Sequence, residues 1–181
     1  MKYNTPHACN GLKIVRLLIL DVDGVLTRGQ VIYDDRGLET KIFDVKDGLG
    51  LRLLMDCGIM VVIATGRCAP ALRHRCHNLG ITRIYDGLRC KSDILEPLSQ
   101  QCGLAASQMA FVGDDLPDLG LMAKVGLAVA VADATPEVKA AADIITKQPG
   151  GQGAVRELCE AILKAQGQWE VMVENIKNER L

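Results

Sequence analysis

The sequence predicts a doubly wound α/β fold built on a parallel sheet. Short, almost continuous apolar runs such as Val15–Leu20 and Met60–Ala64 are typical of parallel strands that are buried on both faces. Segments with helical periodicity separate these runs, and this alternation favours a sheet with helices on both faces. Three of the runs end on polar sequences, so their polar side chains are expected to meet at the carboxyl edge of the sheet.

The expected elements follow in order along the chain. The strands are Val15–Leu20, Met60–Ala64, Ile81–Tyr85, Ala110–Val112, Leu127–Val131 and Ile144–Ile145. The helices are Gly48–Cys57, Ala69–Leu79, Ser92–Gln101, Leu116–Val125, Pro136–Ala142 and Gly153–Gln166. Thr135 precedes Pro136 and is a typical N-cap, while Gly80 and Gly103 stand where helices should end.

One segment, about residues 29–46, interrupts the alternation. Val31–Tyr33 and Glu39–Val45 are strand-like runs on either side of the turn Asp34–Gly37, and together they predict a β-hairpin. The hairpin is expected to project near the polar edge of the sheet, as a solvent-exposed ribbon, a flap or an oligomer contact. The tail, about residues 168–181, is expected to be disordered or a frayed helix. The whole chain, 1–181, is expected to form a single domain.

The composition argues against several classes of partner. The chain has 21 Lys and Arg against 22 Asp and Glu, which gives no charge excess for nucleic acid or an anionic membrane surface. Only 3% of residues are aromatic, so platforms for base stacking are not expected. The apolar runs are far too short to span a bilayer and no signal-peptide pattern is present, so a cytoplasmic protein is expected.

Seven cysteines are scattered along the chain without a Cys-x-x-Cys pair. In a reducing compartment they are expected to be free thiols that pack as small apolar side chains. A zinc site of His74, Cys76 and His77 is an alternative, but a fourth ligand with recognisable spacing is missing.

Carboxylates gather after two of the expected strands. Asp21 and Asp23 follow the first strand, and Asp114, Asp115 and Asp118 follow a later one. Carboxylates this close repel one another unless a cation lies between them or one of them holds a proton. A donor set of oxygen atoms without histidine or cysteine indicates Mg²⁺ rather than zinc.

Thr65 and Lys91 complete the expected phosphate site. Thr65 follows an apolar strand, and Gly66 allows a backbone N–H group to approach an anion closely. Lys91 opens the next expected helix. A hydroxyl, backbone amides, an ammonium group and a metal ion together form a cradle for a phosphoryl group.

These segments together resemble the four ordered motifs of the haloacid dehalogenase-like superfamily. The motifs are Asp21-Val22-Asp23-Gly24-Val25-Leu26-Thr27, Thr65-Gly66-Arg67, Lys91 and Gly113-Asp114-Asp115-Leu116-Pro117-Asp118. The resemblance, from Val15 to about Ile145, implies a phosphatase with Asp21 as nucleophile and Asp23 as general acid and base. It implies that Asp21, Asp23 through its carbonyl, and Asp114 bind Mg²⁺. Thr65 and Lys91 would hold the phosphoryl oxygens, and Asp115 and Asp118 would orient metal waters, Lys91 or the loop.

Neither place where this superfamily inserts a cap domain has room for one. The segment from Asp21 to Thr65 holds only the hairpin and one helix, and that from Lys91 to Asp114 holds one helix and one strand. The crevice is therefore expected to be open to bulky substrates or covered by a neighbouring subunit. An open site excludes water poorly, which favours an oligomer.

A closer resemblance is to the family of 3-deoxy-D-manno-octulosonate 8-phosphate phosphatases. It covers about Ile14–Gly167 and rests on the capless form, the hairpin and the segments Phe43–Gly50, Val112–Leu116, Val129–Ala134 and Gly150–Glu157. The resemblance implies a magnesium-dependent homotetramer of lipopolysaccharide sugar synthesis, with hairpins at its centre and neighbouring subunits closing each active site. Gly150–Glu157 is either a flexible lead-in to a helix or a loop that reaches a neighbour's site.

The sugar phosphate of that family carries a phosphate and a carboxylate, so it needs cations at two places. The expected substrate-binding set is Asp23, Asp44, Val45, Lys46, Asp47, Gly48, Arg52, Arg67, Arg75 and Lys91. Arg52 and Arg75 have a simpler interpretation as surface helix charges. The family more often has Arg where this chain has Lys46, and lysine lacks the bidentate fork of arginine.

Three other functions stay open. A phosphatase for a nine-carbon, sialic-acid-type ulosonate 9-phosphate would use the same capless fold. A non-catalytic assembly domain is disfavoured because a degenerate site would be expected to lose some of its catalytic residues. A phosphomutase is disfavoured because mutases need a cap to hold the intermediate away from water.

Overall fold

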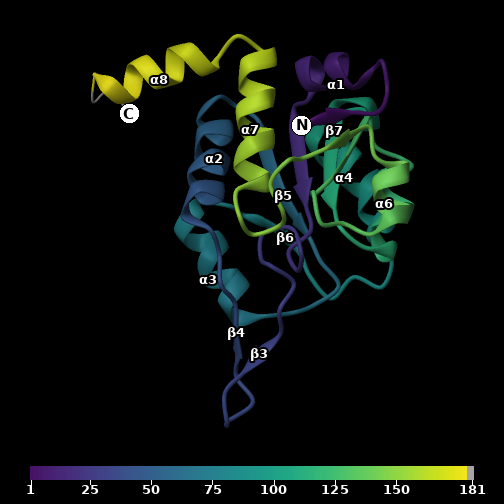
Figure 1. The fold of residues 1–181 in the computed structure, drawn as a ribbon, viewed down its shortest axis with the longest axis vertical. Helices are drawn as coiled ribbons and strands as arrows, with labels where there is room; N and C mark the ends of the chain where they lie inside the picture. Colours follow the sequence, from purple (N-terminus) through teal and green to yellow (C-terminus); the bar gives the residue numbers. More distant parts are fainter. Residues whose placement is uncertain (179–181) are drawn as a thin grey trace.

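The computed structural model describes residues 1–178 and confirms the predicted α/β fold. The central seven-stranded sheet has the order β1-β9-β8-β7-β2-β5-β6 (Figure 1). Strand β2 (Leu17–Leu20) lies inside the sheet and pairs in parallel with β5 (Met60–Ala64) on one side and β7 (Met109–Gly113) on the other. Only β1 (Lys2–Tyr3), at one edge, runs antiparallel to its neighbour within this described sheet.

The remaining elements connect these strands. The strands are β6 (Arg83–Tyr85), β8 (Leu127–Ala130) and β9 (Ile144–Ile145). The helices are α1 (Ala8–Ile14), α2 (Val45–Asp56), α3 (Pro70–Leu79), α4 (Leu95–Cys102), α5 (Leu119–Met122), α6 (Pro136–Ala141), α7 (Ala154–Ala165) and α8 (Trp169–Lys177). Short 3₁₀ turns lie at Lys91–Ile94, Ala106–Gln108 and Leu116–Asp118.

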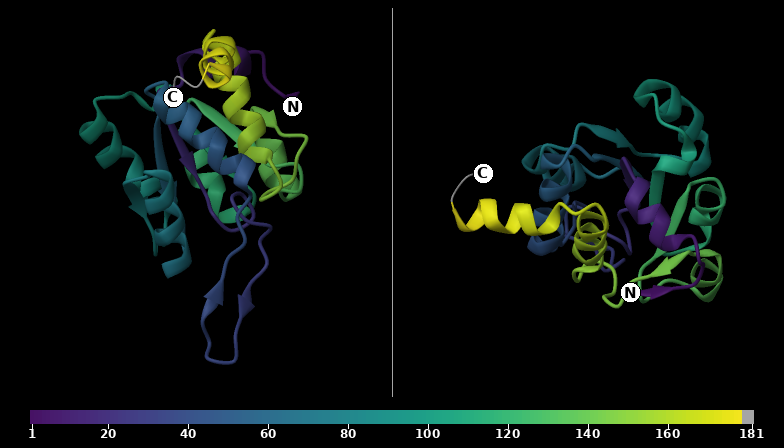
Figure 2. Two further views of the ribbon diagram at one scale, coloured as in Figure 1. Left: turned by 90° about the vertical axis from the view of Figure 1, so that its left-hand side faces the viewer. Right: turned by 90° about the horizontal axis from the view of Figure 1, so that it is seen from above.

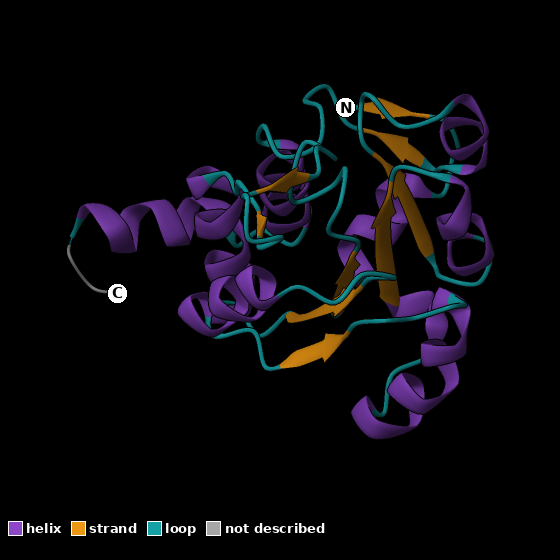
Figure 3. Cartoon of the chain, turned by 90° about the horizontal axis from the view of Figure 1, so that it is seen from below, coloured by secondary structure: helices purple, strands orange, loops and turns teal. Residues whose placement is uncertain are grey.

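Helices cover both faces of the sheet (Figure 3). Helices α2 and α7 pack against each other, with α3 beside α2, while α5 packs against β7 and α6. The chain runs from β2 outward to β5 and β6 and then crosses back to β7. Such a reversal of strand order leaves a crevice beyond the carboxyl ends of the two central strands, here β2 and β7. All four residues of β2 are fully buried, which explains their unbroken apolar pattern.

The predicted hairpin is present and projects far from the body of the molecule (Figure 2). It pairs β3 (Ile32–Tyr33) with β4 (Glu39–Thr40). The expected second strand, Glu39–Val45, is too long: β4 ends at Thr40, and α2 begins at Val45 rather than at Gly48. Asp44 caps this helix: its side chain accepts a hydrogen bond of 2.6 Å from the backbone N–H of Lys46.

The sequence analysis left out the elements at the start of the chain, and the helical alternative that it gave for the tail is confirmed. Strand β1 and helix α1 were missed. In the tail, Trp169–Lys177 form α8, whose Trp169 ring lies 5.3 Å from the Arg156 guanidinium carbon and 5.1 Å from Lys164 Nζ. Residues 179–181 of the predicted tail lie outside the described residues. Within 1–178, no helix has the length and apolar character needed to cross a bilayer.

Three of the local predictions can be compared directly with the structure. Gly80 and Gly103 end α3 and α4 in the left-handed conformation, as predicted. Thr135 precedes α6, but its buried hydroxyl has no hydrogen-bond partner in the part of the chain that the structure describes. Thr135 therefore occupies the predicted N-cap position, but its side chain makes no capping hydrogen bond.

Candidate active site

The carboxyl ends of three neighbouring strands bring the central acidic and hydroxyl side chains together. In the parallel register Leu20 is opposite Val112 on one side and Ile63 on the other. The residues that follow these strands, Asp21, Thr65 and Asp114, therefore lie at one edge of the sheet. They line an open cavity of about 460 Å³. Its other lining residues are Asp23, Gly29, Val31, Gly66, Arg67, Leu88, Arg89, Lys91, Asp115, Pro117 and Asp118.

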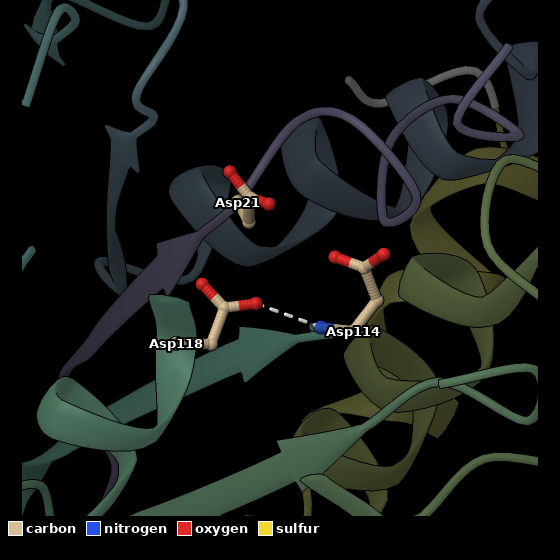
Figure 4. A group of neighbouring side chains, drawn as sticks. All are labelled: Asp21, Asp114 and Asp118. Carbon is tan, nitrogen blue, oxygen red and sulfur yellow. Dashed lines mark hydrogen bonds between the residues drawn. The ribbon is translucent and has the colours of Figure 1, made fainter. Parts of the chain in front are cut away.

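Three carboxylates form a tight cluster in this cavity (Figure 4). Asp21, Asp114 and Asp118 each offer an oxygen atom, and these atoms lie within 4.8 Å of one another. Burial raises the pKa of Asp114 to about 8, and the neighbouring charges of Asp21 and Asp118 add to the shift. Burial also raises the pKa of Asp21 to about 6, although Lys91 opposes that shift. Ionisation of all three carboxyl groups is therefore unfavourable in the protein alone, and a bound cation would stabilise their ionised form.

The donor atoms of this cluster fit Mg²⁺. All of them are carboxylate oxygens, which are the ligands that Mg²⁺ prefers. Oδ1 of Asp114 is buried and has no hydrogen-bond partner among residues 1–178. A buried polar atom without a partner is costly unless a ligand satisfies it.

Asp118 and Lys91 are hydrogen-bonded to each other and support the cluster from within the protein. One oxygen of Asp118 accepts hydrogen bonds from the backbone N–H groups of Asp114 at 2.8 Å and Asp115 at 3.2 Å. Its other oxygen lies 2.5 Å from Lys91 Nζ, which also lies 2.8 Å from Oδ1 of Asp21. Burial alone would lower the pKa of Lys91, but Asp21 and Asp118 raise it overall, so the side chain stays an ammonium ion. Both Asp118 oxygens are thus occupied within the protein.

The loop Asp21–Thr27 is shaped by close backbone contacts. Gly24 has φ +90°, and a Cβ atom there would lie 2.0 Å from Oδ2 of Asp114. On its other side the loop meets Gly150, where a Cβ atom would lie 1.6 Å from the carbonyl oxygen of Gly24. The backbone N–H of Gly151 donates to the carbonyl of Val25 at 2.8 Å. The start of the Gly150–Glu157 segment therefore packs on the Asp21–Thr27 loop of its own chain.

Thr65 and the hairpin close two sides of the cavity. The buried Thr65 hydroxyl oxygen accepts a long hydrogen bond of 3.4 Å from the backbone N–H of Arg67. The Asp23 carboxylate forms ion pairs with Arg67, at 3.6 Å, and with Lys41 of the hairpin. The sequence analysis missed Lys41 and its neighbour Glu39. The only available signal was their spacing of two in a predicted strand, which places both side chains on one face.

The structure divides the predicted substrate-binding set. Asp23, Arg67 and Lys91 line the cavity, whereas Asp44, Val45, Lys46, Asp47, Gly48, Arg52 and Arg75 lie outside it, on and around the first turns of α2 and on α3. Arg75 donates to the carbonyl of Asp44 at 3.2 Å, and Arg52 donates to the carbonyl of Asn78 at 2.5 Å.

Asp47 has a structural task. It is only 1% exposed, and its carboxylate accepts hydrogen bonds from the backbone N–H groups of Arg156 at 2.7 Å and Gly153 at 3.3 Å. It thereby caps the start of α7. This finding corrects the expectation that the Asp47 side chain is free to contact sugar hydroxyls.

The alternative zinc site is not assembled. Cys76 is buried, whereas His74 and His77 are exposed, so the three side chains do not share one face. All seven cysteines are free thiols.

The fold and the site define a haloacid dehalogenase-like hydrolase. Residues 89–158, which include Lys91 and the Asp114–Asp118 loop, match the family model of the haloacid dehalogenase-like hydrolases. The carboxylate cluster lies at the topological switch point, with Lys91 and Thr65 beside it.

Relatives define the family more narrowly. The 3-deoxy-D-manno-octulosonate 8-phosphate phosphatase of Salmonella typhimurium is 45% identical over 163 residues, which cover 90% of this chain and 87% of the relative. The 3-deoxy-D-manno-octulosonate 8-phosphate phosphatase of Escherichia coli K12 is 48% identical over 153 residues, which cover 84% of this chain and 81% of the relative. The crystal structure of the Moraxella catarrhalis enzyme, in complex with magnesium ion, phosphate ion and KDO, superposes with a TM-score of 0.92 at 39% identity over 96% of this chain and 99% of that one. The chain belongs to the family of 3-deoxy-D-manno-octulosonate 8-phosphate phosphatases.

Proposed function

We propose that this chain hydrolyses 3-deoxy-D-manno-octulosonate 8-phosphate to 3-deoxy-D-manno-octulosonate and phosphate, with Mg²⁺ as cofactor, in the synthesis of a lipopolysaccharide sugar. The observation that carries the proposal is the cluster of Asp21, Asp114 and Asp118, whose carboxylate oxygens lie within 4.8 Å of one another, with Lys91 beside Asp21, in a member of this family. The two relatives named above carry the name of this activity.

The reaction runs in two displacements at phosphorus. The Asp21 carboxylate attacks phosphorus and the bond to the sugar oxygen breaks, while Asp23 gives its proton to that oxygen. Water then attacks the aspartyl-phosphate and returns a proton to Asp23. Phosphate leaves, and the Asp21 carboxylate is restored. Asp23 lines the same cavity as Asp21, as both steps require.

The other site residues offset charge. Asp21, the carbonyl of Asp23 and Asp114 would hold Mg²⁺, which reduces repulsion between the anionic nucleophile and the anionic substrate. The Lys91 ammonium, 2.8 Å from Asp21, and the Thr65 hydroxyl would bind the phosphoryl oxygens. Arg67 at the cavity wall is the proposed partner for a further anionic group of the substrate.

The predicted substrate-binding residues that lie outside the cavity are proposed to contact substrate only in an oligomer. The cavity is open, and residues 1–181 are proposed to form one domain without a cap. The hairpin exposes large apolar side chains, namely Val31, Ile32, Tyr33, Leu38 and Ile42. An exposed apolar patch of this kind marks an interaction surface. We therefore propose a cytoplasmic homotetramer in which neighbouring subunits close each active site. In it, Asp44, Val45, Lys46, Gly48, Arg52 and Arg75 contact the sugar, and Asp47 acts only by holding α7.

A substrate panel tests the function. Phosphate release is measured from eight- and nine-carbon ulosonate phosphates, with and without Mg²⁺, for wild type and for Asp21→Asn. The eight-carbon substrate is expected to be turned over fastest, only with Mg²⁺, and not by the variant. A clear preference for the nine-carbon substrate would overturn the substrate assignment alone. No release from any substrate would favour a non-catalytic assembly domain.

A further inference from the structure

Four charged side chains form a closed ring at the junction of the hairpin and the cavity. Lys41 Nζ pairs with Asp23 and, at 3.0 Å, with Glu39. Arg67 pairs with the same two carboxylates, at 3.1 Å to Glu39 and 3.6 Å to Asp23. Charges of opposite sign therefore alternate around Asp23, Lys41, Glu39 and Arg67. The hairpin contributes Glu39 and Lys41 to this ring, and the body contributes the other two.

Lys41 is the most deeply buried member of the ring. Its side chain is 2% exposed, against 42% for Arg67, although both carry a full positive charge. Lys41 does not line the cavity, so its ammonium group is not placed to touch a substrate. Burying an ammonium group is costly unless carboxylates compensate it, so the two ion pairs fix the Lys41 side chain in place.

The ring makes a hydrogen bond to one oxygen of Asp23 and none to the other. Lys41 contacts Oδ1 of Asp23. Oδ2 is buried and has no hydrogen-bond partner in the described chain, and Nε of Arg67 lies 3.6 Å from it. A tether on one oxygen fixes the rotation of the carboxylate and hence the position of the free oxygen. Oδ2 is then the atom able to exchange a proton with the leaving group.

We propose that Lys41 is a positioning residue that aims Oδ2 of Asp23 at the oxygen of the leaving sugar. This inference rests on the proposed function and adds a task for the base of the hairpin within its own chain. Proton transfer to the leaving group depends on distance and direction, so a misplaced acid loses rate without losing substrate affinity. Glu39 completes the ring by holding Lys41 and Arg67 together.

The choice of leaving group makes the test specific. A sugar alkoxide needs a proton in order to leave, whereas p-nitrophenolate does not. We expect Lys41→Met to lower kcat/KM for the eight-carbon sugar phosphate about 100-fold, the size of a lost general acid, through kcat rather than KM. For p-nitrophenyl phosphate the loss of kcat/KM, which reports the first displacement and not the later hydrolysis by water, should stay below about 3-fold, and Lys41→Arg should restore most of the activity on the sugar phosphate.

Two comparisons exclude a general structural effect. Lys177→Met removes an exposed lysine of α8 that pairs with Glu174, outside both the ring and the hairpin, and should leave the turnover of both substrates unaffected. In an Asp23→Asn background, Lys41→Met should cause no further loss, because the group that it positions is gone. Equal losses for both substrates, or losses that multiply with Asp23→Asn, would overturn the inference. A wild type inactive on both substrates would instead overturn the proposed function, and the inference with it.

Discussion

The ammonium group of Lys91 lies 2.8 Å from Oδ1 of Asp21 and 2.5 Å from Oδ1 of Asp118, so two buried carboxylates share one cation. Replacing Lys91 by Met would leave both carboxylates without that partner. We expect the variant to lose at least about 100-fold in kcat. Its free energy of unfolding, measured in urea, should fall by about 3–5 kcal/mol. The matched control is Lys124→Met, because the exposed Lys124 side chain donates to Ser92 alone among residues 1–178. That change should alter stability by less than about 0.5 kcal/mol.

Binding of Mg²⁺ should release protons. The pKa of Asp114 is raised to about 8 by burial and by its acidic neighbours, so without metal this group is protonated at neutral pH. Metal ligation needs the ionised carboxylate, so affinity should rise with pH up to about pH 8. Titration calorimetry at pH 7, in two buffers of different ionisation enthalpy, should report release of about one proton. An affinity that stays constant between pH 6.5 and 8 would contradict the expected protonation of Asp114.

Gly24→Ala should disrupt the carboxylate cluster. The new Cβ atom would lie 2.0 Å from Oδ2 of Asp114, so either that carboxylate or the Asp21–Thr27 loop must move. We expect Mg²⁺ affinity to drop by more than about tenfold, measured by calorimetry. Gly37→Ala is the matched control because Gly37 also has positive φ, +75°, but nothing lies within 4 Å of its added Cβ atom. Equal effects of the two changes would mean that backbone strain alone is responsible.

Asp47→Asn should change the pH dependence of stability. Burial raises the folded-state pKa of Asp47 from 3.8 to about 6. A carboxyl with a raised pKa stabilises the fold below its unfolded pKa, and that contribution is lost as pH rises through its folded pKa. Asparagine does not titrate, so the Asp47→Asn variant does not lose this contribution to stability as pH rises. Its free energy of unfolding relative to wild type should therefore rise by up to about 3 kcal/mol between pH 4 and pH 7. Urea denaturation in the presence of a chelator measures this difference, and a constant difference would contradict the assignment.

The hairpin should control assembly. Leu38 and Ile42 are each 63% exposed, and aspartate at both positions would place charge in the proposed contact between subunits. We expect the double variant to elute as a species of about 19.6 kDa in light scattering, while wild type elutes at about four times that mass. Val171→Asp tests an equally apolar and comparably exposed position on α8, away from the hairpin, and should keep the wild-type mass. A wild type that is already a monomer would end the proposal of shared active sites.

The sequence predicted the centre of the fold and of the site because both follow from local pattern. An unbroken apolar run such as Leu17–Leu20 is typical of a central parallel strand, and the polar residues at its end have to lie at the carboxyl edge. Asp21, Thr65, Lys91 and Asp114 could therefore be placed together before their distances were known. The missed edge strand β1 has two exposed residues and carries no such pattern.

Other features depended on contacts between distant parts of the chain. Asp47 was expected near the substrate, but it caps α7, more than 100 residues further along. The start of α2 was misplaced, although Asp44 is a good N-cap residue and could have marked it. Lys41 lies 18 residues from Asp23, and no spacing rule links a hairpin residue to a loop that precedes it. Helix α8 is held by the stacking of Trp169 on two cations of α7, which composition alone does not reveal.

The contact between Gly150 and the carbonyl of Gly24 has a consequence for the order of events during synthesis. Every acid of the carboxylate cluster has been translated once Asp118 is made, yet the loop that carries Asp21 still lacks the backbone against which it packs. A nascent chain that stops before Gly151 contains the acidic residues of the site but lacks the backbone that packs against the Asp21–Thr27 loop. Activity is thus expected to emerge only after Gly150 and Gly151 have been made, which protects cellular phosphates from premature hydrolysis by the growing chain.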